Sequence, residues 1–238
     1  MISKDIVKKE RFCEFFGALL GDGCISQFVS KGRLYKTIRL EGNKINDYFY
    51  LNRIIKPIIF ELFNKKVNVK PRKDNNSIHI YFKSKEIFDF LITLGFPVGV
   101  KNNLKIPNIF LGLRWQKLKH LILGILDTDG CLHFTKNNKN KNWYPSIEIR
   151  SSSEILLFQL YKILKKQGFT PYIRETHLFL YGKQNIEKWY NEIGFNNIRH
   201  LSKFIFWKEY GFCPIEKELD LKERLQIVGP ICVGPVSV

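Results

Sequence analysis

The sequence predicts an α+β protein of two pseudo-symmetric halves, each with the element order αββαββα and four antiparallel strands. A repeated motif, hairpin signals after each copy, and a second pair of related segments predict this fold. Residues 15–23 read FFGALLGDG and residues 122–130 read ILGILDTDG, with Gly, Asp and Gly at the third, eighth and ninth positions of both. Because Asp22 and Asp129 occupy matching points, we expect two copies of one half of a functional site.

In the first half, helical spacing of apolar residues predicts a motif helix that ends at the GDG turn. Gly23 would take the left-handed conformation just past this helix. Alternating polar and apolar residues predict two hairpins, and Pro57 is expected to kink the long helix between them. The predicted helices cover residues 8–20, 43–63 and 85–94, and the predicted strands cover residues 24–30, 34–41, 67–72 and 78–82.

The second half repeats this order. The segment HIYFKSKEIFDFLITLGF from His79 is related to HLFLYGKQNIEKWYNEIGF from His177, so the repeat extends beyond the motifs. Predicted helices cover residues 115–126, 153–166 and 184–193, and predicted strands cover residues 131–135, 143–150, 171–174 and 177–181. A single four-stranded sheet would bury little by itself, so we expect the halves to pack together.

Breaks in periodicity predict where the halves begin and end. Pro107 and Gly112 interrupt the helical periodicity between the two halves, which predicts a linker over residues 106–113. The predicted halves therefore cover residues 1–105 and 114–225. The remaining residues, 226–238 (QIVGPICVGPVSV), have no charged side chain, and their sequence assigns them no role.

A net charge of +17 is the second strong signal in the chain. Residues 1–112 carry 20 Lys and Arg against 10 Asp and Glu, and residues 113–238 carry 19 against 12, so both halves are basic. A folded protein with this excess most often binds a polyanion, and nucleic acid is the leading candidate. The alternative is a lysine-rich surface that only aids solubility.

The cysteines and the apolar runs limit the cellular context. The five cysteines form no CxxC pair and no zinc-ligand spacing, so we expect reduced thiols and an intracellular protein. No apolar run reaches the roughly 18 residues that a membrane span needs, so no membrane partner is expected.

Small residues four positions apart predict a close contact between the two motif helices. Gly17 and Gly21 share one helix face, as do Gly124 and Thr128. Such faces let two backbones approach closely, which would bring Asp22 and Asp129 together at the helix ends. Either motif alone is also consistent with an ordinary buried helix, but two copies in register favour the paired arrangement.

Two aspartates at two helix C-termini would repel each other and the helix dipoles. The repulsion is about 4 kcal/mol at 4 Å for an effective dielectric constant near 20. A divalent cation removes this cost, and Mg²⁺ suits oxygen ligands from Asp22, Asp129 and the carbonyl groups of Gly21 and Thr128. Because such a metal can activate water at a phosphate, a basic protein with this site is expected to hydrolyse phosphodiesters.

Both motifs resemble that of the LAGLIDADG homing endonucleases in their two-motif, single-chain form, and the resemblance covers most of residues 11–210. It implies a monomer whose motif helices form the interface between two half-domains with curved sheets that grip a long, partly asymmetric DNA duplex. The eighth-position residues, here Asp22 and Asp129, would bind Mg²⁺ and make a staggered double-strand cut. Mn²⁺ would substitute, and Ca²⁺ would bind without supporting cleavage.

The two copies differ at the sixth and seventh motif positions. The sixth is Leu20 in one copy and Asp127 in the other, and the seventh is Gly21 against Thr128. We interpret Asp127 as a hydrogen-bond partner across the helix interface, and a third metal carboxylate is the alternative.

Polar and basic residues on the predicted strands and their loops are the candidate DNA contacts. Arg can read guanine with two hydrogen bonds and Lys can bind phosphate, although each single residue is also consistent with a solvated surface charge. The candidates are Gln27, Arg33, Lys36, Arg39, Glu41, Lys70, Arg72 and Lys83 in the first half, and Lys136, Lys139, Lys141, Glu148, Arg150 and Arg174 in the second.

The resemblance also implies a basic residue near each scissile phosphate. Lys101 lies six residues after Gly95, and His200 lies six residues after Gly194, so the repeat relates them. Lys203 is the alternative to His200. Their catalytic role would be to stabilise charge or position water, while a plain surface charge is the competing interpretation.

The sequence therefore predicts a site-specific, metal-dependent DNA endonuclease encoded by an intron. The alternative is a protein of the same fold that binds nucleic acid without cutting it, either an intron RNA maturase or a regulator. Intron RNA is accordingly a second candidate partner beside double-stranded DNA.

Overall fold

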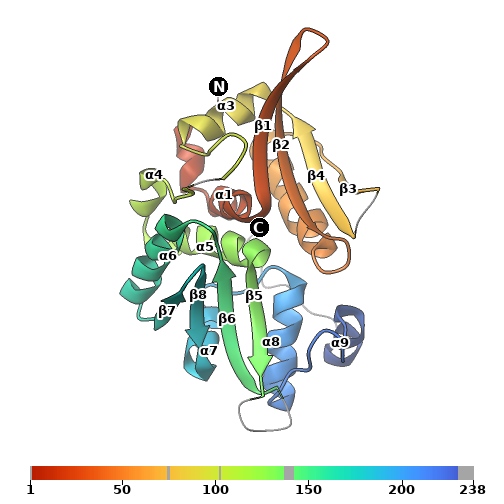
Figure 1. Ribbon diagram of the computed structural model, residues 1–238, viewed down its shortest axis with the longest axis vertical. Coiled ribbons are helices and arrows are strands. Elements are labelled where there is room, and N and C mark those ends of the chain that lie inside the picture. The colour runs from red at the N-terminus through yellow and green to blue at the C-terminus, as the bar shows by residue number, and fades with distance from the viewer. Residues whose placement is uncertain (1, 74–75, 102, 137–141, 230–238) are drawn as a thin grey trace.

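The computed structural model describes residues 2–229 apart from residues 74–75, 102 and 137–141. In this part of the chain the strands form two antiparallel four-stranded sheets with the orders β1-β2-β4-β3 and β5-β6-β8-β7 (Figure 1). The predicted α+β class and the division into two similar halves are confirmed. The first sheet contains β1 (Gly23–Ser30), β2 (Arg33–Asn43), β3 (Val69–Pro71) and β4 (Ser77–Lys83), and the second contains β5 (Gly130–Thr135), β6 (Tyr144–Arg150), β7 (Pro171–Arg174) and β8 (His177–Tyr181).

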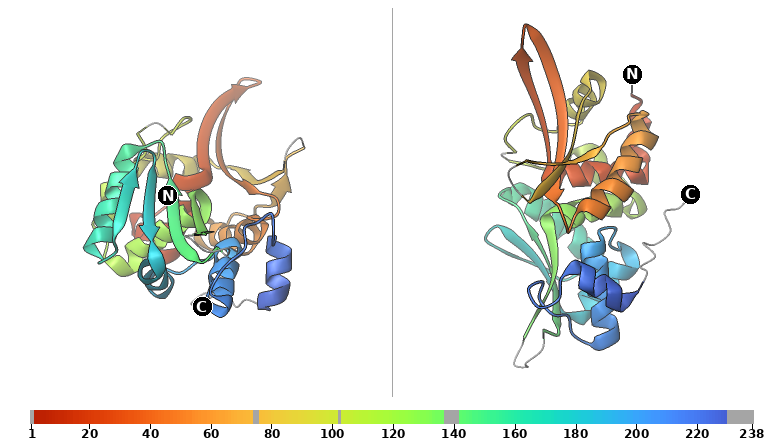
Figure 2. Two further views of the ribbon diagram at one scale, coloured as in Figure 1. Left: turned by 60° about the horizontal axis from the view of Figure 1, so that its bottom comes forward. Right: turned by 90° about the vertical axis from the view of Figure 1, so that its right-hand side faces the viewer.

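Helices cover one face of each sheet. In Figure 1 the strands of both sheets lie in front of helices, and the right-hand view of Figure 2 places the strands on one side of the molecule. The other faces of the two sheets, which we call the open faces, therefore point to the same side. The helices are α1 (Glu10–Asp22), α2 (Lys56–Phe63), α3 (Lys85–Thr93), α4 (Asn108–Leu111), α5 (Trp115–Asp129), α6 (Glu154–Lys166), α7 (Gly182–Glu192), α8 (Ile198–Tyr210) and α9 (Leu221–Val228), with a 3₁₀ turn η1 (Lys4–Lys8).

Helix α1 lies at the centre of the molecule, side by side with α5 between the two sheets (Figure 1). Every residue of α1 from Phe12 to Gly21 is buried. Its aromatic rings pack on the other elements of the first half and on α4, as in the contact of Phe16 with Phe110 at a centroid distance of 4.4 Å. A helix that is apolar on all sides is stable in this position because it packs against several neighbours at once.

The contact between α1 and α5 is made by backbone. A methyl group added at Gly17 would overlap the carbonyl oxygen of Leu121, and one added at Gly124 would overlap the carbonyl oxygen of Glu14 and lie 2.7 Å from the amide nitrogen of Ala18. Both pairs are related by the same 107-residue offset as the motifs. The close approach predicted from the small residues is therefore present in the structure.

The motif helices extend further than the sequence predicts. They end at Asp22 and Asp129 instead of at residues 20 and 126. Gly23 has φ −86° and Gly130 has φ −98°, so the predicted left-handed conformation is wrong. Both glycines begin a strand, and a side chain there would collide with the backbone of Leu19 or Leu126.

The helix around Pro57 is accommodated by a change of helix type. A π-helical turn, η2 (Tyr50–Ile55), precedes α2, and the amide of Lys56 donates to the carbonyl oxygen of Leu51, five residues back. Pro57 follows directly, and η2 and α2 form one continuous helix in which the wider π turn lies next to the residue that lacks an N–H donor.

The predicted linker and tail both contain helical residues. Helix α4 lies within residues 106–113, and the Gln159 side chain both accepts from the amide and donates to the carbonyl oxygen of Ile106, at 2.7 and 3.0 Å. Residues 226–228 belong to α9, while residues 230–238 lie outside the described part of the chain. The domain boundaries themselves stay a prediction. Among the described residues, no helix is long and apolar enough to span a membrane.

Substituting Gly124 with alanine tests the backbone contact. We expect Gly124→Ala to lower the free energy of unfolding by about 1–3 kcal/mol, because the methyl group would separate α1 from α5. The measurement is a urea unfolding curve. The matched control is Gly112→Ala, since Gly112 has φ −78° and a methyl group there would find its nearest neighbour atom at 3.8 Å. Equal stability of the two variants would contradict a contact limited by backbone.

Candidate active site and nucleic-acid interface

Asp22 and Asp129 lie side by side where the two motif helices end. Gly21 faces Thr128 across the helix contact, and a methyl group added to Gly21 would lie 3.4 Å from the carboxyl carbon of Asp129. The charge of Asp129 acts on Asp22, and both residues are partly buried. The pairing predicted from the repeat is therefore present, with one carboxyl group from each half.

Burial and mutual repulsion hold protons on this pair. Burial, and then the neighbouring charges of Asp129 and Asp47, raise the pKa of Asp22 to about 7. Burial also raises the pKa of Asp129, while Lys101 and the hydrogen bond with Asp22 oppose the rise. The two carboxyl groups therefore share a proton near neutral pH unless additional positive charge reaches them.

A cation caps the C-terminus of each motif helix. The ammonium group of Lys101 donates to the carbonyl oxygens of Leu20, at 2.9 Å, and Gly21 at the end of α1. The guanidinium group of Arg199 lies at the end of α5, 3.5 Å from the carbonyl oxygen of Thr128 and 3.3 Å from that of Gly130. Each cation thus offsets the negative end of one helix dipole beside the carboxylate pair.

Arg199 was not predicted, and it takes the place that the repeat assigned to His200. Counting six residues from Gly95 and Gly194 aligns Lys101 with His200. In the structure the residue equivalent to Lys101 is Arg199. Contact with two helix-end carbonyl groups suits a side chain that is always positively charged and has several N–H donors. This requirement favours Arg199 over His200 and is a signal that the sequence contains.

His200 is a buried structural residue. Its side chain is fully buried, Nδ1 accepts a hydrogen bond from the Leu132 amide at 3.3 Å, and burial lowers its pKa well below the usual value. The ring holds strand β5 against α8, where neither a phosphate nor solvent reaches it. The structure therefore argues against both the catalytic role and the surface charge considered for His200.

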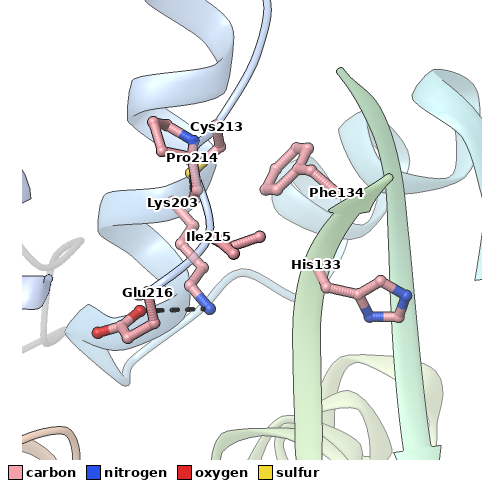
Figure 3. Close-up of a pocket in the computed structure, with 7 residues that line it drawn as sticks. All are labelled: His133, Phe134, Lys203, Cys213, Pro214, Ile215 and Glu216. Carbon is pink, nitrogen blue, oxygen red and sulfur yellow. Dashed lines mark hydrogen bonds and ion pairs between the residues drawn. The ribbon is translucent and has the colours of Figure 1, made fainter. Parts of the chain in front are cut away.

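Lys203 belongs to a small cavity on the far side of β5. Its Nζ lies 3.7 Å from a carboxylate oxygen of Glu216. Figure 3 shows Lys203 reaching toward Glu216 and His133 pointing away from the cavity, which has a volume of about 100 Å³. The positive charge of Lys203 is therefore engaged with Glu216 and is not directed at the paired aspartates.

Arg199 is also held by a residue of the first half. Asp47, in the loop after β2, places Oδ1 3.6 Å from Arg199 Nη1 and 2.8 Å from Nδ2 of Asn197, which donates to it. Asn197 Nδ2 also lies 3.0 Å from the carbonyl oxygen of Asp127. Lys101 has no comparable acidic partner among the interactions of the described residues, so the two caps are not equivalent.

Asp127 faces the protein interior and not the carboxylate pair. It is fully buried, its Oδ2 accepts from the Asn196 amide at 2.9 Å, and the Asn196 side chain donates to Glu14 at 2.8 Å. Burial, with Glu14 nearby, raises the pKa of Asp127 well above its usual range. The hydrogen bond that Asp127 accepts comes from its own half, and the Asn196 side chain makes the contact with Glu14 of the first half. Asp127 is thus linked to the first half only through Asn196, and its full burial argues against a third metal carboxylate.

The first open face carries most of the predicted contacts of its half. Because Ile25, Ile38 and Leu40 point to the helices, the alternating positions of each strand point outward. The outward positions hold Arg33, Arg39, Glu41, Lys70 and Lys83, and Arg72 joins them by donating to Glu41 at 2.7 Å.

Two predicted contacts of the first half point the other way. Lys36 lies on the helix-covered face, where it pairs with Asp89 of α3 and lies over the Phe88 ring. Gln27 is its register partner and shares that face. Near-alternate spacing of charges does not reveal which face of a strand is covered, so the sequence could not separate these two residues from the outward set; their contact with DNA stays a prediction.

The second open face carries Glu148, Arg150 and Arg174 of the predicted set. Lys136 is exposed just after β5, while Lys139 and Lys141 lie outside the described residues. The Glu148 carboxylate contacts two histidines, with its oxygens 3.3 Å from His177 Nε2 and 3.8 Å from His133 Nδ1.

The donor set at the helix junction fits a hard divalent cation. Mg²⁺ is commonly bound by one or two carboxylates together with water and phosphate oxygens, and Asp22 and Asp129 supply two carboxylates with raised pKa values. In the described chain no cluster of three or more metal-ligating side chains is present. The carbonyl groups of Gly21 and Thr128, predicted as ligands, accept from Lys101 and Arg199 instead.

Comparison with known proteins agrees with this architecture. The family model of the LAGLIDADG-like domain matches residues 117–194, which contain the second motif. The resemblance predicted from the motifs is therefore confirmed, and the match falls in the second half. No curated protein matches the chain.

Solved structures extend the likeness to both halves. I-DmoI in complex with DNA and Mn shares 15% identity at a TM-score of 0.56, over 78% of this chain and 96% of that one. The I-LtrWI LAGLIDADG homing endonuclease bound to target DNA shares 12% identity at a TM-score of 0.56, over 92% and 96%. A point mutant of I-SmaMI shares 11% identity at a TM-score of 0.55, over 91% and 94%. The chain has the fold of these single-chain LAGLIDADG homing endonucleases.

The difference in stability between an Asp22→Asn variant and the wild type should depend on pH. A carboxyl pKa that is raised on folding means that stability falls as pH rises from about 4 to about 7, because the folded state binds the proton more tightly than the unfolded chain. We therefore expect Asp22→Asn, measured by urea unfolding in EDTA, to exceed the wild type by on the order of 2 kcal/mol at pH 8 and by little near pH 4.

Asp5→Asn is the control, because its ion pair with Lys8 lowers the pKa of Asp5 and this substitution removes no repulsion. A difference between Asp22→Asn and the wild type that does not grow with pH would contradict the raised pKa.

Proposed function

We propose that this protein is a site-specific, metal-dependent endonuclease that makes a staggered double-strand cut in a long, partly asymmetric DNA duplex. The observation that carries the proposal is the pair of carboxyl groups, one from each half, at the junction of two backbone-packed helices. The pair supplies negative oxygen ligands where two pseudo-symmetric open faces meet, and two strands of one duplex are likewise related by a two-fold axis.

Divalent metal binding explains why two repelling carboxylates are kept at this point. Asp22 and Asp129 would hold Mg²⁺, with Mn²⁺ as a substitute and Ca²⁺ as an ion that binds without supporting cleavage. The bound metal would supply activated water and neutralise charge at the scissile phosphate. The solved structures with this fold include complexes with Mn, with Ca and with Mg, which supports the use of divalent metal.

Lys101 and Arg199 have a separate part in this proposal. Both cations lie beside the carboxylates and are already ordered by helix-end carbonyl groups. A preordered positive group lowers the energy of the extra negative charge that develops on a phosphate during hydrolysis. We therefore assign each of them to charge stabilisation at one scissile phosphate.

The open faces supply the DNA-binding surface in this proposal. They point to the same side of the molecule (Figure 2) and carry Arg and Lys at outward positions, in a chain of net charge +17. I-DmoI and I-LtrWI have the same fold in complex with DNA. We propose that the protein acts as a monomer, that it is intracellular and that it is encoded by an intron.

Cleavage of a selected duplex tests the metal site. A target is first selected by binding from a randomised duplex library, and cutting is then measured with Mg²⁺ for the wild type, Asp22→Asn and Asp129→Asn. We expect one specific double-strand cut that both variants abolish or reduce to a nick, because each removes one carboxylate ligand. Asp5→Asn is the control and should cut like the wild type. Unchanged cutting by both active-site variants would contradict the assignment, and specific binding without any cut would favour the non-cleaving alternative.

The role of the two helix-end cations is tested by Lys101→Met and Arg199→Met. We expect each to slow cleavage by about 100-fold while the dissociation constant of the target changes little, because the groups stabilise charge that develops during the reaction. Arg199→Lys should recover part of the rate. Lys105→Met, four residues from Lys101 and exposed, is the control and should cut normally. A loss of binding that accounts for the whole loss of cleavage would overturn this role.

A further inference from the structure

The two open faces differ in chemistry at equivalent positions. The register of the strands aligns His79, Tyr81 and Lys83 of β4 with His177, Phe179 and Tyr181 of β8. In the first sheet this row ends in a lysine whose Nζ lies 3.8 Å from the centroid of the Tyr35 ring. In the second sheet it is a continuous row of three rings, which we call the β8 ladder (His177, Phe179 and Tyr181).

The rings of the β8 ladder lie parallel and face one another along the strand. Ring centroids of His177 and Phe179 are 5.8 Å apart with an interplanar angle of 13°, and those of Phe179 and Tyr181 are 5.2 Å apart with an angle of 12°. The corresponding His79 and Tyr81 rings are tilted by 82° at 6.4 Å, so the first sheet has no such ladder at these positions.

This spacing leaves no room for an unpaired base between the rings. A base stacked on both faces would need the two rings about 6.8 Å apart, twice the 3.4 Å rise of stacked bases. Because the faces of Phe179 are turned toward its neighbours, the ladder presents ring edges to the outside. Edges of this kind form an apolar ridge that fits against small groups on a groove floor, and a ridge of edges is a poor platform for single-stranded nucleic acid.

This part of the second open face offers mainly exposed apolar surface for binding. Tyr181 is 43% exposed, and Tyr172, beside Phe179 on the neighbouring strand, is 54% exposed. The polar groups next to the ladder are already engaged, since Glu148 contacts two histidines and Ser146 lies 2.8 Å from His133 Nε2. Arg150 and Arg174 lie at the His177 end of the ladder.

We propose that Phe179 and Tyr181 recognise thymine through its C5-methyl group in the DNA half-site that the second sheet binds. This inference rests on the proposed function and adds the kind of readout that the second half uses. The thymine methyl group is the apolar feature of the major groove, and aromatic edges bury it without requiring a hydrogen bond. The equivalent row of the first sheet has tilted His79 and Tyr81 rings and ends in Lys83, so it offers no such ladder at these positions.

Uracil substitution tests the proposal, because deoxyuridine lacks only the methyl group. Each thymine of the selected target is replaced in turn, and the dissociation constant is measured for the wild type, Phe179→Ser and Tyr181→Ser. For the wild type we expect thymines in one half-site at which the loss of the methyl weakens binding about fourfold each. With Phe179→Ser or Tyr181→Ser, the ratio of the uracil to the thymine dissociation constant should fall to about one at the thymines that the altered residue contacts.

Tyr81→Ser is the matched control, because Tyr81 occupies the position of Phe179 in the first sheet and is 41% exposed. It should leave the methyl-dependent positions unchanged, and Phe179→Leu, which keeps an apolar side chain, should retain them. Thermal unfolding followed by circular dichroism confirms that each variant is folded.

The outcomes separate this inference from the proposed function. Specific binding by the wild type with no methyl-dependent thymine, or with methyl dependence that survives in Phe179→Ser and Tyr181→Ser, would overturn the inference and leave the proposed function standing. Failure to select any specific duplex would overturn the proposed function and this inference with it.

Discussion

The backbone contact between α1 and α5 is the constraint on which the rest of the structure depends. Gly17 and Gly124 let each helix meet the other's carbonyl groups directly, and no larger side chain fits at either position. This contact joins the two halves and also places the two helix ends together. Asp22 and Asp129 are the last residues of those helices, so the geometry of the carboxyl pair follows from the packing and needs no separate support.

That placement is electrostatically costly, and the surrounding residues reduce the cost without removing it. Lys101 and Arg199 offset the helix ends, yet the pKa of Asp22 is still raised to about 7 by burial and by its acidic neighbours. Stability given up at one point of a fold commonly marks a functional site. Here the missing element is positive charge, which a divalent cation would bring.

The halves are similar in backbone and different in side chains. Asp47 ties Arg199 to the first half and Asp127 is buried where the first motif has Leu20, so the two sides of the junction are held differently. The open faces differ as well, since Lys83 and Tyr181 occupy equivalent strand positions. A single chain can diversify its two surfaces independently, whereas two identical subunits would present the same surface twice. Such a chain is suited to a target whose two half-sites differ.

The sequence by itself determined the two-half α+β fold and the pairing of Asp22 with Asp129, because a duplicated motif and alternating strand patterns are local signals that survive in any context. Tertiary structure alone decided which side chains gather around that pair. Arg199 rather than His200 caps α5, and Lys36 points to the helices, because a one-residue shift in a loop and the choice of buried face depend on contacts between segments far apart in the chain. Charge and spacing along a sequence carry no record of those contacts.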